Sequence, residues 1–209
     1  MPILDINPIA LPCTAGLVSC LGDSAPSSLS TLGNLALLEQ NKLALFCSTA
    51  CPAELMTQAQ HVIQSGLPST VAVISGFHSP GERECLRTLL SRHQPIIICP
   101  ARSLTKLRIR TEYKKALDEG RLLFLSFFRS HRHRSDIAMA RSRNRFVAAL
   151  ADRILVLYAA SASKTEIFCR ELLPWKKSLF TLPSDLNQKL VAFGAKPLNS
   201  QELRNWHDG

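Results

Sequence analysis

The sequence predicts a single α/β domain whose mostly parallel, doubly wound sheet lies between two layers of helices. Three observations lead to this prediction. Short continuous apolar runs, typical of strands buried on both faces, recur along the chain. Segments with a helical apolar period lie between these runs, and strands that alternate with helices form parallel sheets. With 209 residues, 46% of them hydrophobic, the chain can bury a substantial core in one domain.

Six apolar runs are the expected strands. Five of them are continuous and should lie parallel in one sheet, and the sixth resembles them. In chain order they cover residues 43–47, 71–74, 96–99, 122–125, 154–158 and 178–182.

Apolar residues three or four positions apart indicate four helices between these runs. The first ends near Gly66, the second begins after Pro80, and the fourth ends before Pro174. Their apolar faces lie within residues 55–63, 85–90, 137–151 and 167–172. This order of elements is that of a Rossmann-like, three-layer α/β/α fold.

Residues 26–198 are expected to form this domain, with residues 1–25 as an irregular N-terminal arm and residues 199–209 as a C-terminal tail. No apolar run reaches the ~18 residues that a membrane span needs, so we expect no membrane contact. Residues 1–22 hold no Lys or Arg, unlike a secretory signal. The seven scattered cysteines indicate reduced thiols, and therefore a cytoplasmic protein.

Function is expected at the carboxyl ends of the strands, where parallel sheets bind their ligands. Ser48 and Thr49 follow the first strand and precede a helix, a place where free N–H groups suit a phosphate. Ordinary helix capping by these hydroxyls is the alternative. Ser161, Ser163 and Lys164 follow the fifth strand in the same way, again with a capping turn as the alternative, and G-x-x-x-x-G-K is absent.

The turn after the second strand offers Ser75, Gly76 and His78, and Gly76 lets a ligand approach the backbone. His78 beside Ser79 suggests a nucleophile and its base, but sequence neighbours rarely reach that geometry and G-x-S-x-G is absent. We therefore expect a polar ligand loop and no catalytic residue.

Positive charge points to a polyanionic partner. The formal net charge is +9, although general basicity with no specific partner would also give it. Between residues 129 and 145 a single acid, Asp136, accompanies Asn144 and six arginines: Arg129, Arg132, Arg134, Arg141, Arg143 and Arg145. Arginine binds phosphate in a planar, bidentate way, so this stripe favours nucleic acid over a merely solvated face.

Three further features of the sequence bear on ligand binding: a second basic cluster, aromatic residues and two histidines. A second basic cluster comprises Arg102, Lys106, Arg108, Arg110, Lys114 and Lys115. Candidates for base stacking are Phe77, Phe127 and Phe128. No C-x-x-C pair supports His131 and His133 as metal ligands, so we expect neither a metal nor another cofactor.

Several stretches, taken in order, resemble the core of the DNA-processing protein A (DprA/Smf) family. Residues 26–38 are similar to the family's lead-in to its first strand, and Ser75-Gly76 to its Ser-Gly turn. The sharpest match is residues 143–152, which resemble the family's Arg-Asn-Arg helix. Asn187 and the Gly-Ala at 194–195 are similar to its closing segment, so the resemblance covers residues 26–198.

This resemblance implies a non-catalytic protein that binds single-stranded DNA, protects it and loads a RecA-type recombinase, usually as a homodimer. It also implies a DNA pocket at the strand ends, lined by backbone glycines and basic side chains. An arginine at position 145 has an alternative role as a brace of the fold.

The sequence departs from the family at the turns that would contact DNA. The family's Gly-Ser-Arg is here Cys47-Ser48-Thr49, so the arginine contact is missing. The family's Ser-Gly-Ser turn is here Ser161-Ala162-Ser163. Two alternatives stay open: a LOG-like protein that binds or hydrolyses nucleoside monophosphates, faintly echoed by residues 163–166, and an interaction subunit of a multigene system.

Overall fold

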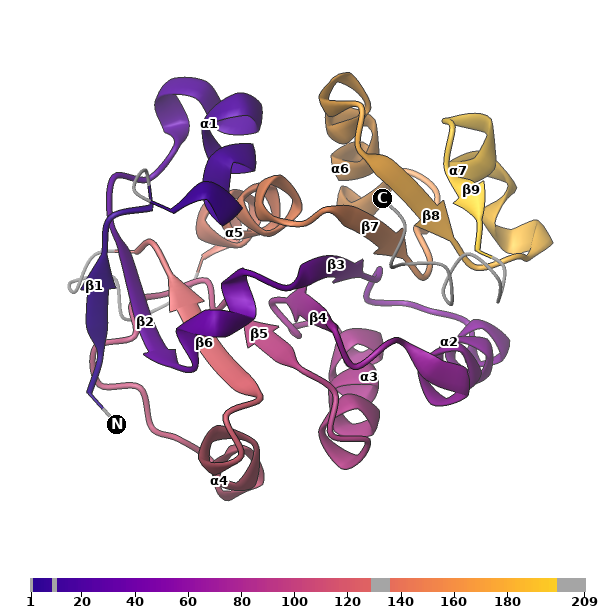
Figure 1. Ribbon diagram of the computed structural model, residues 1–209. Helices are drawn as coiled ribbons and strands as arrows, with labels where there is room; N and C mark the ends of the chain where they lie inside the picture. Colours follow the sequence, from indigo (N-terminus) through magenta and orange to yellow (C-terminus); the bar gives the residue numbers. More distant parts are fainter. Residues whose placement is uncertain (1, 9–10, 129–135, 199–209) are drawn as a thin grey trace.

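One nine-stranded sheet forms the centre of the molecule (Figure 1). The computed structural model describes residues 2–8, 11–128 and 136–198. The spatial order of the strands is β1-β2-β6-β5-β4-β3-β7-β8-β9. Their bounds are β1 Leu4–Ile6, β2 Leu29–Gly33, β3 Asn41–Phe46, β4 Val71–Ser75, β5 Ile96–Ile98, β6 Leu122–Ser126, β7 Arg153–Val156, β8 Ser178–Thr181 and β9 Lys196–Pro197.

The sheet is doubly wound, as the sequence predicted. Every neighbouring pair from β6 across to β9 is parallel, and only β1 and β2 are antiparallel to their neighbours. All six predicted runs are strands of this parallel part. The chain lays down β3 to β6 in one direction and then returns to place β7 beside β3. The strand order therefore reverses between β3 and β7, where α/β sheets bind ligands.

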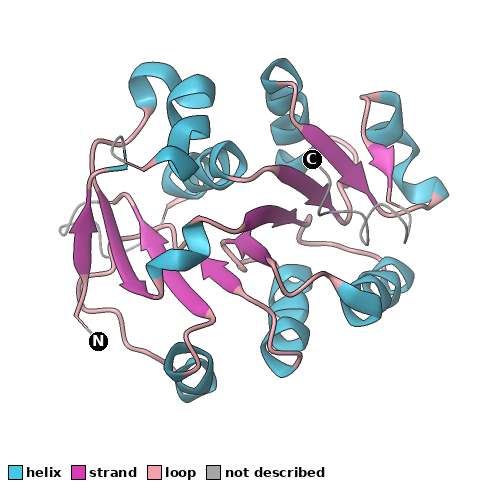
Figure 2. Cartoon of the chain, viewed as in Figure 1, coloured by secondary structure: helices cyan, strands magenta, loops and turns pink. Residues whose placement is uncertain are grey.

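Helices cover both faces of the sheet (Figure 2). Side chains alternate along β3, so that Leu43 and Leu45 pack with α2, α3 and α4, whereas Ala44 and Phe46 pack with α1, α5 and α6. The bounds of the helices are α1 Ala15–Leu21, α2 Ala53–Gly66, α3 Pro80–Ser91, α4 Thr111–Asp118, α5 Ile137–Leu150, α6 Lys164–Leu172 and α7 Gln188–Ala192. None of the described helices is long and apolar enough to cross a membrane.

The segment before residue 26 is not irregular, contrary to the sequence-based expectation. β1 pairs with β2, and α1 packs against α5. At Gly16 a Cβ would lie 2.4 Å from the carbonyl oxygen of Ala149, so glycine is needed for this close packing. β1 and α1 have only three and seven residues, too few to show a period in the sequence.

Two lysines are tied to backbone carbonyls at the amino ends of the strands. Lys42, 4% exposed, donates to Leu38 O at 3.1 Å and Gln40 O at 2.8 Å, and pairs with Asp152 at 3.3 Å. Lys177 donates to the carbonyls of Ala149 and Ala151 at the end of α5. Both ammonium groups therefore stabilise the fold by satisfying backbone carbonyls.

The cysteines are free thiols, as predicted. Burial raises the pKa of Cys85, Cys99 and Cys169 to about 12, so these three side chains remain protonated at neutral pH and pack as small apolar groups.

Candidate nucleic-acid interface

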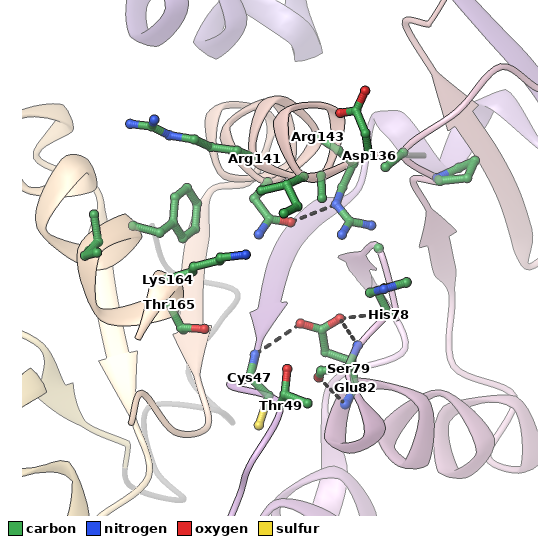
Figure 3. Close-up of a pocket in the computed structure, with 18 of the residues that line it drawn as sticks. Cys47, Thr49, His78, Ser79, Glu82, Asp136, Arg141, Arg143, Lys164 and Thr165 are labelled. Carbon is green, nitrogen blue, oxygen red and sulfur yellow. Dashed lines mark hydrogen bonds between the residues drawn. The ribbon is translucent and has the colours of Figure 1, made fainter. Parts of the chain in front are cut away.

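A cavity of about 810 Å³ opens at the carboxyl ends of the strands. The ends of β3, β4 and β5 and the first turns of α3, α5 and α6 line it (Figure 3). It therefore contains the point where the strand order reverses, at the end of the sheet where the sequence predicted the ligand.

The floor of the cavity is the β4–α3 turn, organised by the buried carboxylate of Glu82. This carboxylate accepts hydrogen bonds from the backbone N–H groups of Cys47 at 3.2 Å, His78 at 2.7 Å and Ser79 at 3.3 Å (Figure 3). The Ser79 hydroxyl in turn accepts from the Glu82 N–H, which completes a capping box. A protein carboxylate thus occupies the N–H groups that a phosphate would need at α3.

The roof of the cavity contains a buried guanidinium, that of Arg143 on α5. It donates to the Cys99 carbonyl at 3.0 Å and to the Asn144 side chain at 2.7 Å. Among the described residues it forms no ion pair, and burial lowers its pKa. Gly76 makes this position possible, because a Cβ there would lie 1.2 Å from an Arg143 nitrogen.

The other two described arginines of α5 share one carboxylate. Arg141 and Arg145 both pair with Glu171 of α6, Arg145 at 3.6 Å. The Arg145 guanidinium also lies 5.5 Å from the centre of the Trp175 ring. Two of the three described arginines in the predicted stripe therefore hold α5 against α6.

The β7–α6 loop supplies an unpaired lysine. Ser163 caps α6, and the buried Glu166 carboxylate accepts from the Ala162 N–H and pairs with Arg170 at 3.0 Å. These two contacts, the N–H bond foremost, lower the pKa of Glu166. Lys164 follows the cap, extends toward the centre of the cavity (Figure 3), and has no ion-pair partner among the described residues.

Comparison with known proteins assigns this architecture to a family. The family model for DNA recombination-mediator protein A matches residues 15–203. The chain belongs to this family. The predicted resemblance to DNA-processing protein A, abbreviated DprA, is thereby confirmed.

Two solved DprA structures share the fold of this chain. DprA from Streptococcus pneumoniae is 23% identical, with 97% of this chain and 73% of that chain covered and a TM-score of 0.79. DprA from Helicobacter pylori, whose structure concerns a single-stranded DNA binding mode, is 20% identical, with 98% and 94% covered and a TM-score of 0.76. No curated protein matches the chain.

The structure brings seven of the predicted site residues of this DprA family member to the cavity. They are Thr49, Gly76, His78, Arg141, Arg143, Asn144 and Lys164. Three others, Arg129, Arg132 and Arg134, lie outside the described residues.

Five predicted residues do not line the cavity and have other contacts. Ser48 accepts from the Ala160 N–H at 3.1 Å and lies 3.2 Å from the Ser163 hydroxyl, which joins the β3 and β7 loops. Ser75 donates to the Leu45 carbonyl inside the sheet, and Ser161 accepts from Lys189. Arg145 pairs with Glu171 of α6, which agrees with the alternative role of this arginine as a brace of the fold.

Sequence reasoning missed several residues of the cavity. Asp136 caps α5 by accepting from the Met139 N–H at 2.7 Å, and Ile137 and Ile167 line the wall. Arg102, noted only as part of the second basic cluster, also lines it. The one sequence signal that could have indicated these cavity residues is that each follows the carboxyl end of a predicted strand within the next loop or helix. Within the described segments, no group of three or more His, Cys, Asp or Glu side chains could hold a metal ion.

Proposed function

We propose that this cavity binds single-stranded DNA through its phosphates without altering it chemically. The observation that carries the proposal is the buried guanidinium of Arg143, which faces the cavity and forms no ion pair among the described residues, where Glu82 acts on it only as a nearby charge. Removing a cation from water costs free energy unless an anion compensates it. A DNA phosphate would supply that anion.

Lys164 strengthens the argument. It occupies the first helical position of α6, where the helix dipole disfavours a cation. An unfavourable position in the free protein becomes favourable when a phosphate binds between Lys164 and Arg143. Contacts of this kind recognise the backbone and not the bases, so we expect little sequence preference.

The polar side chains of the cavity support binding over hydrolysis. Ser79 is committed to the α3 cap, and the described residues contain no hydrogen bond from its hydroxyl to His78. Glu166, the acid that a LOG-like hydrolase would require, is buried and occupied by Ala162 and Arg170. The nucleotide-hydrolysing alternative is therefore the weaker one.

The wider role follows from family membership. We propose that the protein acts in the cytoplasm as a homodimer that protects single-stranded DNA and delivers it to a RecA-type recombinase. Pull-down of the recombinase with DNA-loaded protein, and sedimentation of the protein alone, test these two statements. A monomer that never retains the recombinase would refute them.

Binding of labelled oligo-dT, measured by fluorescence anisotropy with AMP as competitor, tests the proposed ligand. Arg143→Met removes the cation and keeps an apolar stem, whereas Gly76→Ala retains Arg143 and displaces its guanidinium. Both should weaken binding about tenfold. Arg87→Met, which removes an exposed cation from the far part of α3, is the control.

Unchanged affinity in both variants, with folding verified by circular dichroism, would refute the site. Release of ribose 5-phosphate from AMP would instead favour the hydrolase.

A further inference from the structure

Contacts from α5 to α6 and to the turn that follows α6 recur at intervals of four residues. Arg145 contacts Trp175 and Glu171, and Arg141 contacts Glu171. Both helices follow a parallel strand from its carboxyl end, so they run in the same general direction along the sheet. Positions four residues apart therefore succeed one another on the facing sides of the two helices.

The next positions toward the two N-termini are aliphatic and open. Ile137 lies four residues before Arg141, and Ile167 lies four residues before Glu171. Both line the cavity, and their side chains are 69% and 54% exposed. Isolated exposed hydrophobics are ordinary, but two from different helices at the wall of one cavity form an apolar surface for a ligand.

We propose that the gap between Ile137 and Ile167 holds a nucleobase of the strand whose phosphate binds Arg143 and Lys164. This inference rests on the proposed function and assigns a place to the uncharged part of the same ligand. Lys164 lies three residues before Ile167, so the ammonium and the aliphatic surface share one side of α6. One nucleotide can then contact both.

The surrounding charges favour a neutral base in this gap. Asp136 lies immediately before Ile137, and Glu171, which also lines the cavity, lies four residues after Ile167 and pairs with Arg141 and Arg145. The Asp136 carboxylate disfavours a phosphate beside Ile137, and Lys164 and Arg143 favour one deeper in the cavity, whereas the charge of Glu171 is offset by its two arginines. A base has no net charge and experiences no such repulsion.

The aromatic candidates for base stacking are occupied elsewhere. Phe77 is buried in the core, and Phe127 stacks on Phe128 at 4.2 Å and packs on Phe146 at 4.9 Å. Phe168, which lines the cavity, packs edge-on against Phe46 at 5.0 Å. Among the described residues the aliphatic pair is therefore the exposed apolar surface of the cavity.

Comparison of oligo-dT with an abasic oligonucleotide of equal length tests the inference, because the two share a backbone and differ in bases. The parent should bind oligo-dT more tightly. Ile137→Ser and Ile167→Ser should each weaken oligo-dT binding about fivefold and leave abasic binding unchanged. Val18→Ser is the matched control, because Val18 is also 54% exposed but lies on α1.

Each other result has a definite meaning. A parent that binds both oligonucleotides equally, or isoleucine variants that keep its preference for oligo-dT, would overturn the nucleobase site and leave phosphate binding intact. Variants that change the sedimentation of the free protein but not its preference would overturn it in favour of a second copy of the chain. A parent that binds neither oligonucleotide would refute the proposed function itself.

Discussion

Positively charged side chains at the two ends of the sheet have different surroundings. At the amino ends of the strands, Lys42 and Lys177 donate to backbone carbonyls, two of them at the C-terminus of α5. At the carboxyl ends, Arg143 and Lys164 form no ion pair among the described residues, although the charge of Glu82 acts on Arg143, and Lys164 lies at a helix N-terminus. Helix dipoles favour cations at the first end and disfavour them at the second. The difference teaches that the cations at the amino end stabilise the fold, and it supports our proposal that those at the carboxyl end bind an anion.

Loss of Lys42 should give the largest effect on stability. Lys42→Met leaves the Leu38 and Gln40 carbonyls without their donor and Asp152 without its partner. Because Asp152 is half-exposed, we expect a loss of about 2 kcal/mol in unfolding free energy, measured by urea denaturation. Oligo-dT affinity should not change. A variant that is as stable as the parent would contradict the stabilising role of Lys42 at the amino ends of the strands.

Reversal of the charge of Lys164, at the carboxyl ends of the strands, should raise stability and weaken DNA binding. Lys164→Glu places an acid at the N-terminus of α6, which should raise the unfolding free energy by about 0.5 kcal/mol. The same change should weaken oligo-dT binding about tenfold at low salt, because it repels phosphate. The two measurements, thermal or urea unfolding and anisotropy, should move in opposite directions. A destabilised variant with full affinity would contradict this account of Lys164.

Glycine in place of Ala162 should relieve backbone strain in the loop before α6 and stabilise the protein. Ala162 has φ of 56°, in the left-handed region, and stands at the centre of the turn where the family has Ser-Gly-Ser. Relief of this strain exceeds the added flexibility of the unfolded chain, so Ala162→Gly should gain about 0.5 kcal/mol. Ala160→Gly in the same loop is the control and should not stabilise. A stability loss at position 162 would show that the alanine methyl has a packing role.

Acid should weaken the same loop in a predictable way. The Ala162 N–H and Arg170 hold the folded-state pKa of Glu166 below its usual value. The unfolded chain therefore binds the proton more readily, and this contribution to stability is complete above the unfolded pKa and is lost as the pH falls through the folded one. Glu166→Gln should reduce the decline of unfolding free energy in acid. An unchanged pH profile in this variant would show that the carboxylate contributes nothing.

The parallel sheet was predictable because its strands are continuous apolar runs, and all six appeared as expected. β2 and α4 were missed because they have only five and eight residues, and few of these are apolar. The antiparallel pairing of β2 with β6 depends on contacts about 90 residues apart, which no local pattern contains.

A cavity lies at the end of the sheet where the sequence predicted the ligand, but the pairing of its charged side chains was not predicted. Residues 141, 143 and 145 look equivalent in the sequence, yet the first and the third both pair with Glu171, thirty residues after Arg141. Whether an arginine is free or paired is a property of the folded chain. Ser79-x-x-Glu82 is the sequence signature of a capping box and could have indicated that Glu82 bonds to the N–H groups of the β4–α3 turn, whereas its bond from the Cys47 N–H depends on the fold.

The most direct test of the central claim is the salt dependence of oligo-dT binding by the double variant Arg143→Met/Lys164→Met. Each lost phosphate contact should reduce the slope of log affinity against log salt by about one. We therefore predict a slope shallower than that of the parent by about two, with Arg87→Met unchanged. A double variant that melts like the parent and keeps both its affinity and its slope would show that the phosphates of the DNA bind elsewhere.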